Sequence, residues 1–208
     1  MLATELYEVQ RHSWPSQGQH ILAHYDDSTL IVYQAYNQAI GQHALEHGQL
    51  GGPGFNLARM SWIKPGFLWM MHRSGWGRKE QQQTILGLRL RRIFFEQLLA
   101  QAVPSSCAPD YAGGPAQWQR DLVKSSVRLQ WDPDHAPAGA HHPQQRRALQ
   151  LGLRGKMLAA LAGPELLEVI DLSAFVAAQR ALLEQGQPEA LRLPVERVYP
   201  WPNQLGRK

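Results

Sequence analysis

Hydrophobic and polar residues alternate along several short segments of the chain, and each of these segments predicts a strand. Residues 29–36 (Thr-Leu-Ile-Val-Tyr-Gln-Ala-Tyr) are the clearest case, because they are also rich in β-branched and aromatic residues. A turn at 26–28 makes this strand and the one before it a predicted hairpin. In chain order, the predicted strands are 19–23, 29–36, 61–64, 84–91, 126–131, 147–153 and 168–171.

Amphipathic runs between these segments predict helices. Asn37 is a good N-cap for a helix at 38–47, and Gly48 is a natural stop for it. Ser173 is expected to cap a helix that runs to about Gln185. Further helices are predicted at 67–73, 92–102 and 155–161, and loops at 104–115 and 132–143.

The interleaving of short strands and helices predicts the fold class. No strand leads into a Gly-x-Gly-x-x-Gly turn or a Walker loop, so a doubly wound nucleotide fold is disfavoured. We expect a compact α+β single domain over residues 1–208, with a split or bent, mainly antiparallel sheet flanked by helices. Residues 1–19 are expected to be an irregular N-terminal segment, and 194–208 a proline-rich tail on the surface.

Composition excludes several classes of protein. With 44% hydrophobic and 18% charged residues, the chain of 208 residues is not intrinsically disordered. No apolar run approaches the length of a membrane span, and no secretory signal is visible. The lone cysteine, Cys107, fits a reducing compartment, so we expect a cytoplasmic protein without a membrane partner. The net charge of +4 permits nucleic acid binding and does not demand it.

Segment 59–76 is the densest in chemistry, with three tryptophans spaced by seven among arginines, a lysine and two serines. Guanidinium groups hold phosphate, and aromatic side chains stack on planar rings. We therefore expect a nucleotide or dinucleotide ligand here, with a nucleic acid strand as an alternative. An equally weighted alternative to a ligand site is that the charged residues of this segment form surface salt bridges beside a core. The candidate binding residues are Tyr33, Arg59, Ser61, Trp62, Lys64, Arg73, Ser74 and Trp76.

Polar residues at strand ends supply candidate catalytic groups. Alternation puts Gln34 and Tyr36 on the face of strand 29–36 opposite to Tyr33, which also fits simple aromatic packing. Asp132 is a candidate general base, although Asp-Pro-Asp is also what a turn requires. Without a cysteine pair or a His-Glu-x-x-His helix, we expect no metal site. The candidate catalytic residues are Gln34, Tyr36, Gln130, Asp132 and Gln150.

Several strings of residues together resemble the bacterial domain-of-unknown-function 4291 family. They are 21–27, 32–36, the Trp-rich 59–76, 127–135 and 146–153, so that the resemblance extends from about residue 19 to residue 199. One departure is Gly66, where asparagine is expected. The family name implies a single unit and no reaction.

Strand 32–36 followed by helix 39–48 is more distantly similar to the opening of ADP-ribosyltransferase-like domains. Those domains bind NAD in the cleft of a split sheet. The similarity implies Gln34 or Tyr36 at the first-strand position, Ser61 or Tyr25 in the nicotinamide pocket, and Gln150 near the usual catalytic glutamate. The chain departs from that pattern, because Gln34 replaces a histidine or arginine and Gln150 is not a proton acceptor.

The resemblance and the candidate residues together lead to one expected function. The chain would bind NAD or a related nucleotide, and would break the nicotinamide–ribose bond or transfer ADP-ribose to an acceptor. A nucleic acid is one possible acceptor. The alternatives are a nucleic-acid-binding or nucleic-acid-processing module and a non-catalytic protein-interaction domain. The oligomeric state is not predicted.

Overall fold

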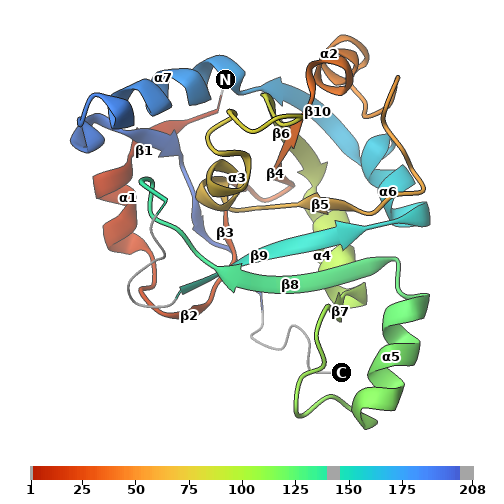
Figure 1. Ribbon diagram of the computed structural model, residues 1–208. Helices are drawn as coiled ribbons and strands as arrows, with labels where there is room; N and C mark the ends of the chain where they lie inside the picture. The colour runs from red at the N-terminus through yellow and green to blue at the C-terminus, as the bar shows by residue number, and fades with distance from the viewer. Residues whose placement is uncertain (1, 140–145, 202–208) are drawn as a thin grey trace.

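The structure, a computed structural model, describes residues 2–139 and 146–201 and has an α+β fold (Figure 1). Within these ranges there are seven α-helices and twelve strands. The helices are α1 (Tyr7–Ser13), α2 (Gln38–His47), α3 (Phe67–Ser74), α4 (Arg92–Gln101), α5 (Gly114–Lys124), α6 (Gly155–Ala162) and α7 (Ser173–Glu184). The strands are β1 (Thr4–Leu6), β2 (Gly18–Gln19), β3 (Leu22–Ala23), β4 (Thr29–Tyr36), β5 (Ser61–Ile63), β6 (Thr84–Arg91), β7 (Val103–Pro104), β8 (Val127–Pro133), β9 (Arg146–Leu153), β10 (Leu166–Asp171), β11 (Arg192–Pro194) and β12 (Arg197–Val198). None of the helices in the described ranges is long and apolar enough to cross a bilayer.

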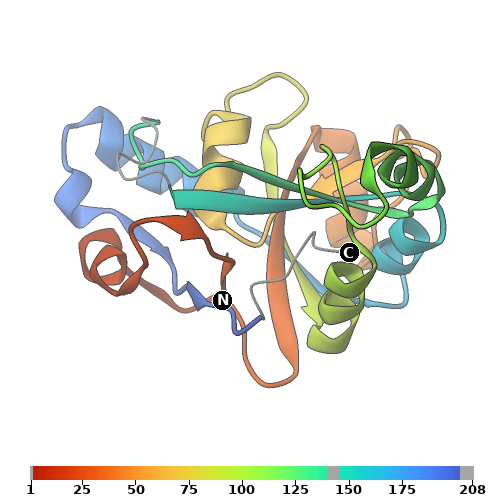
Figure 2. The same cartoon turned by 90° about the horizontal axis from the view of Figure 1, so that it is seen from below.

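The strands form two larger sheets that cross each other. One sheet has the order β10-β6-β4 and is antiparallel throughout. The other has the order β2-β9-β8-β7, and β5 also pairs with β9. This sheet is mixed, because β2 runs parallel to its partner β9 and β7 runs parallel to its partner β8. Figures 1 and 2 show β8 and β9 running across the direction of β4 and β6.

A backbone bridge connects the two sheets. The N–H of Tyr33 in β4 donates to the carbonyl of Lys64 at 2.7 Å, and the N–H of Lys64 donates back at 3.3 Å. Lys64 directly follows β5, so this bridge fixes the start of the Trp-rich segment against the centre of β4. Two short antiparallel pairs, β1–β11 and β3–β12, join the N-terminal and C-terminal segments.

Alternation along β4 divides the core in two. Leu30 and Val32 are fully buried in a cluster that includes the inner side chains of β8 and β9. Ile31 and Tyr33 are fully buried in a second cluster, with α3 and the C-terminal segment. A strand covered on both faces is the main packing element of a fold, and this explains why β4 is so apolar.

Several predicted elements are confirmed. β4 and β6 have the predicted bounds, and the mixed but largely antiparallel sheet agrees with the predicted α+β class. The Asn37 side chain accepts the N–H of Ile40 at 3.0 Å, and Gly48 ends α2 in the left-handed region with φ of 65°. The turn at 26–28 is also confirmed, because the Asp26 carboxylate accepts the N–H groups of Ser28 and Thr29.

Other predictions were wrong. Residues 2–19 of the predicted irregular segment are not irregular, because they contain β1, α1 and β2. The predicted loop 104–115 ends inside α5, a helix that the sequence pattern missed. Ser173 is the first residue of α7 and does not cap it; its hydroxyl instead accepts the N–H of Ile85 at 3.1 Å. β8 continues to Pro133, so Asp132 lies in a strand and not in the predicted loop. Residues 140–143 of that loop lie outside the described residues.

Candidate functional site

One face of the β5–β9–β8 sheet carries most of the predicted polar residues. The register pairs Trp62 with Gly152, Gly152 with Arg128, and Gln150 with Gln130. Directly opposite side chains in an antiparallel pair share a face, and every second residue along a strand returns to it. We use the name polar face for Trp62, Lys64, Arg128, Gln130, Asp132 and Gln150.

Asp132 is the most strongly held side chain of the polar face. Gln130 Nε2 donates to one carboxylate oxygen of Asp132 at 2.7 Å, and Gln150 Nε2 donates to the other at 2.6 Å. Each carboxylate oxygen has a second lone pair, so both can still accept a hydrogen bond from a ligand. The two carboxamides therefore fix the orientation of a half-buried carboxylate and leave it able to bind a hydroxyl or a cation.

Lys64 brings a buried cation to the same face. Its side chain is only 3% exposed, and its Nζ donates to the carbonyl of Trp62 at 3.1 Å. Burial lowers the pKa of Lys64 to about 8; the positive charge of Arg73 lowers it further, and the carboxylate of Asp132 opposes the shift. An ammonium group has three donors, so Lys64 retains donors for a ligand.

The remaining predicted residues of this region lie behind β5. Ser61 is opposite Leu153 in the register, so its side chain is on the face away from Trp62. Gln34 Nε2 donates to Ser61 Oγ at 3.0 Å, and the Tyr36 hydroxyl lies 3.4 Å from the same oxygen. Burial raises the pKa of Tyr36 to about 12, partly offset by Ser61, so the phenol stays protonated at neutral pH.

Tyr36 and Ser61 line a cleft of about 290 Å³, together with Arg59. The structure therefore divides the expected single site. On one side of strand β5 lies the cleft with Tyr36, Arg59 and Ser61, where Gln34 donates a hydrogen bond to Ser61. On the other side lies the polar face with Trp62 and Lys64.

Four predicted binding residues have other surroundings. Tyr33 and Ser74 have no exposed surface, so neither can contact a ligand in this conformation. The Ser74 hydroxyl donates to the carbonyl of Met70 inside α3. Trp76 donates from Nε1 to the carbonyl of Pro137 and lines a separate groove between α3 and α7. Arg73 is exposed on α3, and its charge acts on Lys64.

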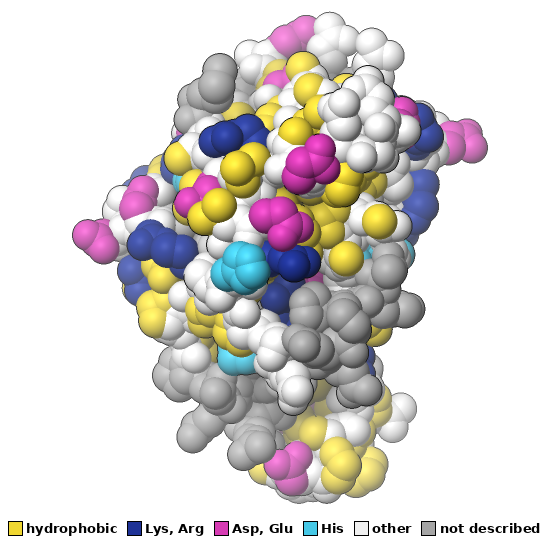
Figure 3. Space-filling model, turned by 90° about the vertical axis from the view of Figure 1, so that its left-hand side faces the viewer, with side chains coloured by type: hydrophobic (Ala, Val, Ile, Leu, Met, Phe, Trp, Pro, Cys, Tyr) yellow, Lys and Arg dark blue, Asp and Glu magenta, His cyan; other side chains and the backbone are white. Residues whose placement is uncertain are grey.

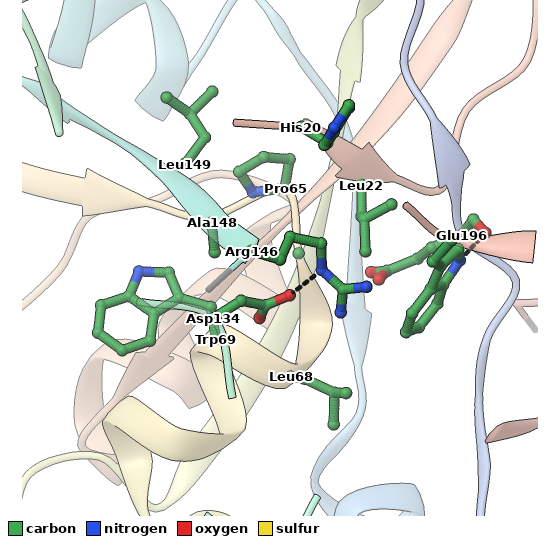
Figure 4. Close-up of a pocket in the computed structure, with 12 residues that line it drawn as sticks. His20, Leu22, Pro65, Leu68, Trp69, Asp134, Arg146, Ala148, Leu149 and Glu196 are labelled. Carbon is green, nitrogen blue, oxygen red and sulfur yellow. Dashed lines mark hydrogen bonds and ion pairs between the residues drawn. The ribbon is translucent and has the colours of Figure 1, made fainter. Parts of the chain in front are cut away.

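Asp134, two residues beyond Asp132, belongs to a different cluster. It is buried and accepts from Nε of the equally buried Arg146 at 2.6 Å. Figure 4 shows Arg146 between Asp134 and Glu196. The Glu196 carboxylate accepts the N–H of Phe67, the first residue of α3, at 2.8 Å.

This cluster encloses a void of only about 10 Å³, too small for an organic ligand. Burial raises the pKa of Glu196 to about 8, although the Phe67 N–H and the charge of Arg146 oppose the shift. The cluster thus fixes the segment around Glu196 against α3 and has no room for a substrate. In the described part of the chain, no group of three His, Cys, Asp or Glu side chains is arranged to hold a metal ion.

Arg128 of the polar face was not predicted from the sequence. It was not among the candidates because it precedes the conspicuous Gln130–His135 string. The alternation of strand 126–131 was the available signal, since it places Arg128 on the same face as Gln130.

Comparison with known proteins identifies the chain at the level of a family. The family model described as Domain of unknown function (DUF4291) matches residues 20–199, which cover both the polar face and the cleft. No curated protein matches the chain.

Proposed function

Because the chain belongs to the DUF4291 family, whose description states no activity, we propose its function from the polar face: it binds NAD or a related nucleotide and breaks the nicotinamide–ribose bond, releasing ADP-ribose to water or to an acceptor. Nucleic acid is one candidate for this acceptor.

The observation that carries this proposal is the Asp132 carboxylate, oriented by Gln130 and Gln150. When a ribose C1′–N bond breaks, its electron pair moves to the pyridinium nitrogen and positive charge develops on the sugar. A fixed carboxylate stabilises that charge and accepts a hydrogen bond from a ribose hydroxyl. A water or an acceptor hydroxyl then bonds to C1′ and loses its proton to solvent, while neutral nicotinamide departs.

Asp132 thus supplies the carboxylate that Gln150 lacks. The similarity to ADP-ribosyltransferase-like domains implies a glutamate near position 150, and Gln150 cannot replace its charge. The Asp132 carboxylate, which accepts from Gln150 at 2.6 Å, supplies that charge in this proposal. Gln150 keeps a positioning role, and Gln130 supports the other oxygen.

The surroundings of Asp132 suit the rest of a nucleotide. Trp62 is half-buried on the same face and offers an indole ring for stacking. Lys64 and Arg73 supply positive charge for phosphate groups. Arg59, which lines the cleft behind β5, is not part of this arrangement.

The proposal is tested by nicotinamide release from NAD and by calorimetric binding of NAD to the full chain. Asp132→Asn keeps the shape of the side chain and removes its charge, so release is expected to fall at least 100-fold while NAD affinity changes by a few-fold. Asp27→Asn, at an exposed turn, is the matched control and is expected to behave as the wild type. Equal release by Asp132→Asn, or no binding of NAD to the wild type, would overturn the proposal.

Nucleic acid binding is the competing outcome of the same experiment. The side of the molecule near α1 and α7 carries acidic side chains among the basic ones (Figure 3). A mixed surface of this kind does not favour a phosphate backbone there. A nucleic acid ligand would show affinity that falls steeply with salt, whereas a dinucleotide with two phosphates shows a shallow dependence.

A further inference from the structure

Arg128 stands in a row of residues that crosses four strands. The register places it opposite Gly152 of β9, which is itself opposite Trp62 of β5, and next to Val103 of β7. The row Val103–Arg128–Gly152–Trp62 therefore runs straight across the polar face. The guanidinium is separated from the indole only by the position of a glycine.

The guanidinium of Arg128 has no acceptor among the described residues. Its Nε is buried and makes no hydrogen bond, and the ion pairs of the described residues do not include Arg128. The neighbouring arginines differ: Arg146 pairs with Asp134, and Arg154 donates from Nε to the carbonyl of Ser125 at 2.8 Å. A half-buried charge without a partner costs free energy, which a bound anion would recover.

The distance along β8 indicates what size of ligand would reach both Arg128 and Asp132. The two residues are four positions apart on one face, which is about 13 Å at the usual rise of a strand. A single sugar does not extend so far, whereas a ribose attached to a diphosphate does once the long arginine side chain reaches toward it. Lys64 follows the end of the β5–β9 pairing, and its charge interacts with that of Asp132.

We infer that Arg128 binds the pyrophosphate of the ligand, with its guanidinium fork on phosphate oxygens and the Trp62 ring beside it. The identity of the ligand as a nucleotide rests on the proposed function; the anion-binding role of Arg128 rests on its missing acceptor and its place in the row. Arginine suits this role because its fork matches two phosphate oxygens at once.

Calorimetric titrations of the full chain with inorganic pyrophosphate, ADP-ribose and NAD test this inference. Arg128→Met keeps the apolar stem and removes the charge, and Arg128→Lys keeps the charge and removes the fork. Both are expected to weaken pyrophosphate and ADP-ribose binding at least tenfold. Arg147→Met is the matched control, because Arg147 is exposed on β9 and alternation places it on the opposite face from Gln150; its affinities are expected to stay within twofold.

A thermal melt separates ligand binding from a structural role. If Arg128 is held for a ligand, Arg128→Met without ligand melts at the same temperature as the wild type or higher, because an unpaired charge has been removed. A lower melting temperature together with unchanged affinity would overturn the inference, and so would a wild type that binds neither pyrophosphate nor ADP-ribose.

The two proposals fail in different ways. Unchanged ADP-ribose affinity in Arg128→Met would overturn the role of Arg128 and leave Asp132-dependent release of nicotinamide standing. Arg128-dependent binding of pyrophosphate by a protein that does not cleave NAD would support the role of Arg128 and overturn the proposed reaction.

Discussion

The indole of Trp62 lies over Gly152 of the neighbouring strand, where a β-carbon at position 152 would come within 2.9 Å of the ring. The same β-carbon would approach the sulfur of Met60 at 2.7 Å. Gly152 is thus the residue that lets the tryptophan ring approach the backbone of β9 beside Arg128. The orientation of the stacking surface depends on the absence of a side chain.

Gly152→Ala is therefore expected to displace Trp62. Overpacking of this kind costs about 1–3 kcal/mol, which denaturant unfolding measures. Affinity for ADP-ribose is expected to fall as the ring moves. In a Trp62→Leu background the same alanine has less to displace, so a double-mutant cycle should give a smaller loss of stability. An equal loss in both backgrounds would show that the ring is not the cause.

Lys64 is expected to make stability depend on pH in the alkaline range. Its folded pKa of about 8 lies below its ordinary value of 10.5, so between these values the unfolded chain binds more protons than the folded one. Stability contributed by this group therefore rises with pH from about 8 to about 10.5. Lys64→Met lacks this dependence, so its stability relative to the wild type should be greater at pH 7 than at pH 10. An equal stability difference between Lys64→Met and the wild type at pH 7 and pH 10 would contradict the expectation.

Glu196 is expected to act in the opposite direction and at lower pH. Its folded pKa of about 8 lies above the ordinary value of 4.5, so the folded state binds more protons between these limits. Its contribution is fully present below pH 4.5 and is lost as pH rises through about 8. Glu196→Gln keeps an acceptor for the Phe67 N–H and cannot ionise, so chemical unfolding should show a flatter profile between pH 5 and 8.5. A profile as steep as that of the wild type would assign the dependence to other groups.

The cap of α2 is a local prediction that does not depend on function. Asn37→Ala removes the acceptor for the Ile40 N–H and is expected to cost about 1 kcal/mol. Asn37→Ser, which can still cap, should restore most of that stability in urea unfolding. Since Asn37 also donates to Gln81, a loss that serine does not recover would point to that second bond.

The sequence predicted those elements whose causes lie close together in the chain. β4 and α2 are examples, because alternation, an asparagine cap and a stop glycine all act within a few residues. β1 was missed because the strand that pairs with it, among the described residues, is the distant β11, with Thr4 opposite Pro194. Three residues with no local pattern give no signal until the other end of the chain is placed beside them.

The candidate site was predicted as a set of residue types and not as an arrangement. Gln130, Asp132 and Gln150 were among the predicted residues, and the structure joins them by hydrogen bonds. Ser61 and Trp62 are adjacent in sequence, yet alternation sends their side chains to opposite faces of β5. The closeness of these polar and aromatic residues in the sequence therefore overstated how many of them share one site. Only the register between β5, β8 and β9 could separate them.

The contacts of Glu196 have a consequence for synthesis of the protein. The N–H of Phe67 and the indole N–H of Trp14 both donate to this one residue, which is synthesised 129 and 182 residues after them. On the ribosome, α1 and the first turn of α3 are made long before their acceptor exists. The second hydrophobic cluster also needs Leu191 and Leu193, so a chain that stops before residue 191 should leave this cluster open and be retained by chaperones.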